Sequence, residues 1–191
     1  MVGNIPNFTK IDILRCFLRF SKNIGRQELS RDLELGEGTI RTILGILKSK
    51  KLLDSTKKGH FLSKMGFEML SQICKSITIP KDVTIDTLYP YFKKVSVLVR
   101  NIQSLKELYK LRDIAVKSGA DGAIILKFDK KLYAPESGYE HDYKELERYF
   151  DFKNNDVLII AFSNKSKNAE NGALAIAIEL SDFLKRFVSA F

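Results

Sequence analysis

Residues 26–50 constrain the fold more than any other segment, because they predict two helices joined by a very short turn. In the first, residues 26–33, Leu29 and Leu33 lie four residues apart on one helix face. In the second, residues 37–50, the apolar side chains also recur at helical spacing. Gly36 falls at the N-cap of the second helix, a position that tolerates glycine. The two helices must therefore pack against each other.

The flanking residues predict the rest of an N-terminal domain, residues 1–78. Apolar positions at 3.6-residue spacing predict a helix over residues 10–20. Residues 52–56 and 60–62 read as two strands around the turn Lys57-Lys58-Gly59. Residues 63–77 predict a fourth helix, which must end before Pro80 because the residue before a proline is pushed out of the helical region.

Three helices, a hairpin and a fourth helix resemble a winged helix-turn-helix domain. The core positions of that family, where apolar residues hold the two helices together, are matched by Leu29, Leu33, Leu35, Ile40 and Leu44. Ser30 fills a position where the family needs a small side chain, and residues 62–66 match the return from the wing. The whole chain also resembles an archaeal type of transcriptional regulator with a C-terminal α/β domain of poorly known function.

The resemblance implies that the second helix of the pair enters the major groove of DNA and that the hairpin contacts the backbone. The residues it places at DNA are Arg31, Gly38, Thr39, Arg41, Thr42, Gly45, Lys48, Lys57, Lys58 and His60. Arg41 can bond guanine through both arms of its guanidinium. Gly45 departs from the family's pattern, and its missing side chain permits close approach of DNA or of a second subunit. The alternative is a basic surface that only contacts water.

The net charge of +9 is concentrated in the first domain. Residues 1–80 carry 14 Lys and Arg against 7 Asp and Glu, whereas residues 81–191 carry 18 against 16. A basic first domain beside a nearly neutral second one indicates a polyanionic partner, double-stranded DNA, for the first only.

Residues 79–93 contain two prolines and are interpreted as a linker and lead-in to a second domain, residues 94–191. There, strands are predicted at 95–99, 122–128, 132–134 and 156–162, and helices at 104–118, 143–150 and 168–187. Ser104 and Glu107 form a capping-box pattern, and Gly119 stops that helix. The order βαββαβ predicts a ferredoxin-like sheet in an α+β chain. Residues 173–180 also alternate, and a strand there would favour a profilin- or roadblock-like sheet.

A polar loop between the last strand and the last helix is a candidate ligand site. Its residues are Ser163, Asn164, Lys165, Ser166 and Asn168. Backbone amides and lysines at a helix N-terminus can hold a small anionic effector. An ordinary connection with solvated lysines is the alternative.

The remaining reactive side chains do not form a catalytic or metal-binding pattern. Cys16 and Cys74 lie among apolar residues at helical spacing, which predicts core positions. His141 lies among loop carboxylates, and His60 belongs to the hairpin. We find neither a phosphate-binding glycine loop nor a serine or cysteine within a recognisable nucleophile motif, so the sequence predicts no enzyme, no cofactor and no metal.

These features together predict a sequence-specific DNA-binding regulator of transcription that acts as a homodimer. We see neither a signal peptide nor an apolar stretch that could span a membrane, so we expect a cytoplasmic protein. The fourth helix and the final helix carry the apolar stripes that a dimer interface needs. Two alternatives stay open: a winged helix that binds protein or RNA without an operator, and an enzyme with a vestigial winged helix.

Overall fold

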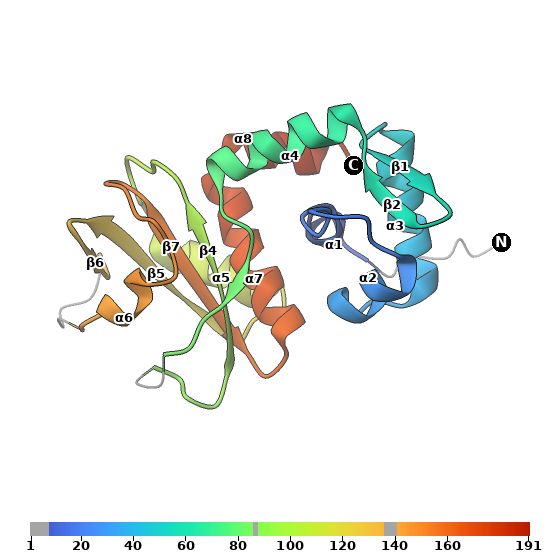
Figure 1. Cartoon of the computed structure of the whole chain (residues 1–191). Coiled ribbons are helices and arrows are strands. Elements are labelled where there is room, and N and C mark those ends of the chain that lie inside the picture. Colours follow the sequence, from blue (N-terminus) through green and yellow to red (C-terminus); the bar gives the residue numbers. More distant parts are fainter. Residues whose placement is uncertain (1–7, 86–87, 136–140) are drawn as a thin grey trace. The chain divides into compact units, whose positions relative to one another are not determined.

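The chain forms two compact units in the computed structural model, which describes residues 8–85, 88–135 and 141–191. The first unit comprises residues 1–73 together with residues 186–191, and the second comprises residues 74–185. Figure 1 labels the elements of both. This division differs from the predicted one at both ends of the second domain. The second unit begins at residue 74 instead of 94, and residues 186–191 group with the first unit.

The first unit contains the predicted order of three helices, a hairpin and a fourth helix. The elements are α1 (Lys10–Phe17), α2 (Arg26–Leu33), α3 (Glu37–Ser49), β1 (Leu53–Thr56), β2 (Gly59–Leu62) and α4 (Lys64–Ser76). Helix α2 has the predicted bounds, and α1 ends three residues earlier than predicted. The apolar side chains of the helix pair are buried, including the five that were assigned to its core.

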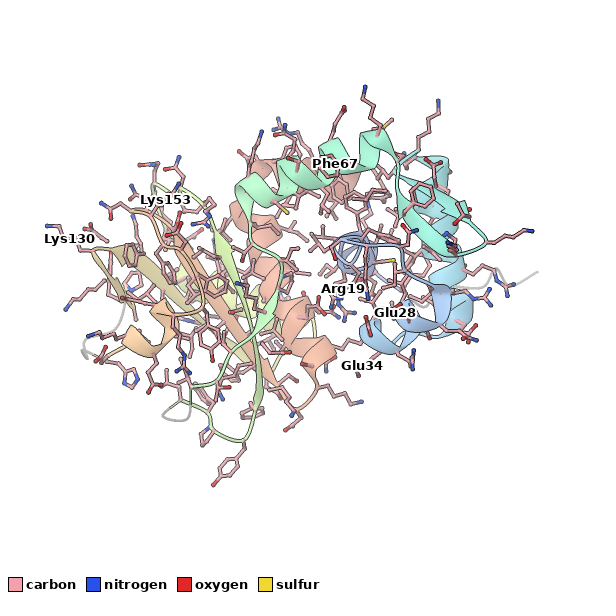
Figure 2. All side chains as sticks on the ribbon, in the orientation of Figure 1. Arg19, Glu28, Glu34, Phe67, Lys130 and Lys153 are labelled. Atoms are coloured by element: carbon pink, nitrogen blue, oxygen red, sulfur yellow. The ribbon has the colours of Figure 1, made fainter. Side chains whose placement is uncertain are left out.

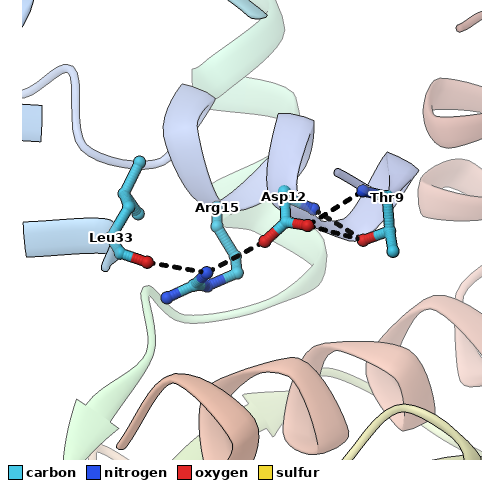
Figure 3. A network of polar contacts seen from close by, with 4 residues as sticks. All are labelled: Thr9, Asp12, Arg15 and Leu33. Carbon is cyan, nitrogen blue, oxygen red and sulfur yellow. Dashed lines mark hydrogen bonds and ion pairs between the residues drawn. The ribbon is translucent and has the colours of Figure 1, made fainter. Parts of the chain in front are cut away.

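Helix α1 begins with a capping box that the sequence analysis did not identify. The Thr9 hydroxyl oxygen accepts a hydrogen bond from the Asp12 amide at 3.3 Å, and the Asp12 carboxylate accepts one from the Thr9 amide at 2.9 Å. Figure 3 shows that the same carboxylate binds buried Arg15, 3.0 Å away. Arg15 also donates to the Leu33 carbonyl oxygen at the end of α2, so one network joins the two helices.

The turn between α2 and α3 is closed by backbone and side-chain hydrogen bonds. Glu34 adopts a left-handed conformation with φ of 52°, which ends α2. The Leu35 amide then donates to the Ser30 carbonyl oxygen, and the Ser30 hydroxyl donates to the Leu35 carbonyl oxygen. Ser30 therefore fixes the turn as well as allowing the helices to approach.

The second unit is a mixed α/β layer structure built on a five-stranded antiparallel sheet. Its strands are β3 (Lys81–Asp82), β4 (Lys93–Val99), β5 (Gly122–Asp129), β6 (Lys131–Tyr133) and β7 (Val157–Ser163). Its helices are α5 (Leu108–Lys117), α6 (Lys144–Glu147) and α7 (Ser166–Leu180), and α8 (Asp182–Ser189) follows. Helices α5 and α7 contact each other and the sheet.

The strands follow the predicted βαββαβ order along the chain but not the ferredoxin-like order in the sheet. In that arrangement the third strand of the motif lies between the first two, whereas here the fourth, β7, lies between β4 and β5. Every residue of β7 is buried, and the strand pairs with β4 along one edge and with β5 along the other. Strand β6 has only three residues and pairs with β5 alone, at the sheet's edge. The ferredoxin-like prediction is therefore wrong.

Two predicted helices differ from those observed. Helix α5 starts at Leu108, because Glu107 adopts a left-handed conformation with φ of 52° and its side chain pairs with Lys110 instead of capping. The predicted capping box at Ser104 is thus wrong. Residues 173–180 are helical, which excludes the alternative that required a strand there. The predicted last helix is divided at Ser181, whose backbone is extended.

The residues interpreted as a linker belong to the second unit. Strand β3 pairs with β4, and Val83 and Ile85 are buried with Leu98, Leu126 and Leu158 in one apolar cluster. The last three side chains share a face because their strands pair in register. Among the residues that the structure describes, none of the helices combines the length and apolar character needed to cross a bilayer.

Candidate nucleic-acid interface

Helix α3 presents one face to solvent because its other face packs into the first unit. Ile40, Ile43, Leu44 and Leu47 are at most 3% exposed and anchor the helix. On the opposite face of the helix, the predicted contact residues Gly38, Arg41, Thr42 and Gly45 are exposed, and Thr39 and Lys48 are partly exposed. Arg31, on α2, is exposed as well. The helical period thus places the predicted DNA-contacting residues on the accessible side.

Side-chain contacts hold parts of this face in place. The Thr42 hydroxyl donates to the Gly38 carbonyl oxygen at 3.2 Å. The Lys48 ammonium donates to the Ser55 hydroxyl at 2.8 Å, which links α3 to strand β1. Gly45 has no atom within 4 Å of the position that a Cβ would occupy, so protein packing does not require glycine there.

The hairpin is attached to the segment that precedes α2. His60 on β2 exchanges two backbone hydrogen bonds with Ile24, each 3.0 Å long. Gly59 has φ of 129°, and a Cβ there would lie 2.8 Å from the Ile24 carbonyl oxygen, so glycine is required at this turn. Lys57 and Lys58 are exposed at the tip. The hairpin is therefore held beside the start of α2 with its lysines accessible.

A groove of about 690 Å³ lies between α3, the start of α2 and the hairpin. We call it the basic groove; it is lined by Gly25, Arg26, Gln27, Arg41, Leu44, Gly45, Lys48, Thr56, Lys57, Lys58, Gly59 and His60. Six of the ten predicted DNA-contacting residues are in this set. The other four, Arg31, Gly38, Thr39 and Thr42, lie outside the lining. The structure thus brings the second half of α3 and the hairpin turn to one concavity.

The basic groove is strongly cationic. Five lysine and arginine side chains line it, and the lining residues include neither aspartate nor glutamate. A carboxylate holds Arg26, whose guanidinium lies 3.1 Å from Glu37. Burial lowers the pKa of His60, and the cations of Lys48 and Arg26 lower it further. Closely spaced cations around a concave surface attract a polyanion.

The sequence analysis missed Arg26 and Gln27 as residues of this surface. They open α2, and they reach the groove because Ile24 pairs with His60 and brings the start of α2 beside the hairpin. That pairing joins residues 36 positions apart, so local spacing carried no signal for it. The basic character of Arg26 next to the break at Gly25 was the one available hint.

The polar loop proposed to bind an anion is partly occupied by carboxylates of the protein itself. The Asn164 amide donates to Asp121, and the Ser166 hydroxyl donates to Asp82, both at 3.3 Å. Ser163 is buried at the end of β7, and Lys165 is the exposed N-cap residue of α7. Asn168 lies against Gly119. An anionic ligand here would have to displace or tolerate two negative charges.

The other reactive residues differ in their surroundings. Cys16 is buried, and burial raises its pKa to about 12. Cys74 is exposed, so its predicted core position is wrong. The His141 ring lies 4.9 Å from the Tyr143 ring. In the described ranges, we find no group of three or more metal-ligating side chains.

The two apolar stripes suggested for dimerisation differ in exposure. Phe187 on α8 is only 7% exposed, and its ring lies 5.4 Å from the ring of Phe17. The end of α8 therefore covers α1 within the same chain. The stripe predicted on the fourth helix is not an exposed apolar face, because Ile73 and Ile77 are buried and Met69 and Leu70 are partly buried. Outside that stripe, Met65 and Phe67 on α4 are 44% and 68% exposed, and Figure 2 labels Phe67 there.

Comparisons with known proteins agree with a regulator-like chain. Residues 10–68 match the family model described as "PH0730-like, N-terminal domain", and residues 91–180 match a domain of unknown function (DUF4443). The solved structure of "Hypothetical protein PH0730 from Pyrococcus horikoshii OT3" is 28% identical, with a TM-score of 0.79, over 94% of this chain and 99% of that chain.

A second similarity concerns a curated protein of named function. Over 110 residues, or 58% of this chain, the sequence is 31% identical to the "Central glycolytic genes regulator" of Bacillus subtilis (strain 168). The matched segment spans 28% of that protein's length. This chain is therefore similar to part of a gene regulator.

Proposed function

We propose that the protein is a sequence-specific DNA-binding regulator of transcription, and that its first unit acts as a winged helix-turn-helix domain. The observation that carries this proposal is the basic groove, which joins α3 and the hairpin turn in one cationic concavity without a carboxylate in its lining. The similarity to a regulator of glycolytic genes supports it.

The groove suits the path of one DNA strand. With α3 in the major groove, phosphates of the flanking backbone would lie between that helix and the hairpin. Lys57 and Lys58 at the hairpin tip then neutralise phosphates without reading sequence. Arg41 projects from the exposed face of α3 and supplies the bidentate contact to guanine.

The regulator acts as a homodimer in this proposal. One short helix contacts too few base pairs to distinguish an operator among genomic competitors, and a second half-site multiplies the discrimination. Because Phe187 is covered by α1, the exposed Met65 and Phe67 on α4 are the better candidates for the interface. Sedimentation at micromolar concentration tests this: a single species at the 21.8 kDa of one chain would contradict the dimer.

The second unit serves in ligand sensing or assembly, and the protein is not an enzyme. An anionic effector at the loop of residues 163–168 would have to replace the contacts of Asp82 and Asp121. Calorimetric titration with inorganic phosphate tests that role. The protein would act in the cytoplasm, where its DNA lies.

A selection from a random duplex library tests the proposed function. Purified wild-type protein and an Arg41→Ala variant are each taken through the same rounds, and bound duplexes are sequenced. The wild type should enrich a short reproducible motif, palindromic if the protein is a dimer, and the variant should lose preference at one position per half-site. No enrichment above the input library, or preferential retention of RNA competitor, would reject a DNA-reading regulator.

A further inference from the structure

His60 occupies a fixed place in the wall of the basic groove. It lies opposite Ser55 in the hairpin register, and its backbone amide and carbonyl both bond Ile24. Its side chain is partly exposed and lines the groove. These two bonds fix the backbone from which the imidazole projects.

The groups around this imidazole oppose a positive charge on it. Lys48 on α3 and Arg26 on α2 act on it electrostatically, and Lys57 and Lys58 stand in the adjoining turn. The adjoining elements also carry two carboxylates, Glu37 on α3, which Arg26 binds, and Asp54 on β1, which lies opposite Phe61.

Among the described residues, the buried Nδ1 atom of His60 has no hydrogen-bond partner. Burial, Lys48 and Arg26 together hold the pKa of His60 below the ordinary histidine value. In the free protein these surroundings favour the neutral ring over imidazolium.

A DNA strand in the groove reverses this environment. Its phosphates neutralise the surrounding cations and add negative potential, both of which favour imidazolium over imidazole. Because Nδ1 is buried, the bond to phosphate comes from Nε2, and a charged N–H donor bonds phosphate more strongly than a neutral one.

We propose that His60 takes up one proton from solvent when DNA fills the basic groove, and that the resulting imidazolium donates a hydrogen bond to a phosphate. DNA binding by this protein is therefore coupled to pH. This inference rests on the proposed function, since it assigns a phosphate-contacting residue to the same groove.

The sign of the coupling follows from linkage. Because DNA raises the pKa of His60, protonation of this residue does not change the affinity for DNA at pH values above its pKa in both the free protein and the complex. It increases as pH falls through the pKa of the complex and levels off below that of the free protein. Each unit by which DNA raises the pKa gives about a tenfold tightening.

Nuclear magnetic resonance tests the proton uptake directly, because the chain has only two histidines, His60 and His141. The imidazole carbon-bound protons of the full-length protein are followed through a pH titration, alone and with a mixed-sequence duplex of about 25 base pairs. A His60→Gln variant assigns the signals. We expect the midpoint of His60 to rise on DNA addition. An unchanged His60 midpoint in the presence of bound duplex overturns the inference.

Binding isotherms with the same duplex at constant ionic strength give a second readout. Between about pH 8 and about pH 6, the range in which histidines titrate, the wild type should bind progressively more tightly. His60→Gln should lose that dependence, while His141→Gln should keep it. If the wild type and His60→Gln respond alike, the inference fails and the proposed function stands. If the duplex does not bind at any pH, both fail.

Discussion

The substitution Gly45→Ala should stabilise the protein and weaken its binding to DNA. No atom lies within 4 Å of the Cβ position at residue 45, so the added methyl group meets no steric resistance in the free protein. An exposed glycine inside a helix costs about 0.5–1 kcal/mol relative to alanine. For a chain of this size, that gain corresponds to a rise in melting temperature of about 1–4 °C.

The same methyl group projects into the basic groove, where the bound DNA must fit closely. An extra methyl group in a packed contact costs about 1–3 kcal/mol, which is a loss in affinity of about fivefold or more. Circular dichroism melts and fluorescence anisotropy with an operator duplex measure the two effects. Ser49→Ala is the control, because Ser49 is exposed on α3 but outside the groove lining. Undiminished affinity of Gly45→Ala would refute the close approach of DNA to residue 45. A lowered melting temperature would show that the added methyl group is obstructed in the free protein.

Three further predictions concern side chains of different roles. Arg41→Ala should relax base preference and cost about 1–3 kcal/mol of binding free energy, whereas Lys58→Ala should weaken binding to all DNA sequences alike and reduce the salt dependence of the binding constant by about one unit of slope. Binding isotherms at several salt concentrations distinguish the two variants. Identical effects would refute the assignment of base reading to Arg41 and phosphate binding to Lys58. Asp12→Ala should lower the unfolding free energy in urea by about 3–5 kcal/mol, because it removes the carboxylate from a buried ion pair; a loss below about 1 kcal/mol would contradict this. In native protein, a thiol reagent should modify exposed Cys74 and spare Cys16 until denaturant is added, and equal rates would contradict the burial of Cys16.

Local signals in the sequence predicted the first unit well. Helix α2 and the hairpin depend on apolar spacing and on glycines within a few residues, and the structure has them close to the predicted bounds. Arg26 was missed as a groove residue because a pairing between Ile24 and His60 brings it there.

The second unit was predicted less well because its arrangement depends on contacts distant in sequence. The apolar run of residues 157–161 indicates a buried strand, and β7 is buried throughout. The run does not indicate which strands pair with it, and these are β4 and β5. Ser181 divides the last helix although it lies in a segment with good helical spacing. The covering of α1 by Phe187 joins opposite ends of the chain, and no pattern near either residue indicated it.

The affinities of two charge-reversal variants for one duplex test the central claim, that the basic groove is where DNA binds. Lys58→Glu and Lys130→Glu each replace an exposed lysine beside a hairpin turn, the first in the groove and the second between β5 and β6. Both lower the net charge equally, so a general attraction between a basic protein and DNA would weaken equally in both. We predict that at about 0.1 M salt Lys58→Glu binds about tenfold or more weakly than wild type, while Lys130→Glu stays within about twofold. Equal losses in the two variants would contradict the assignment of DNA binding to the groove.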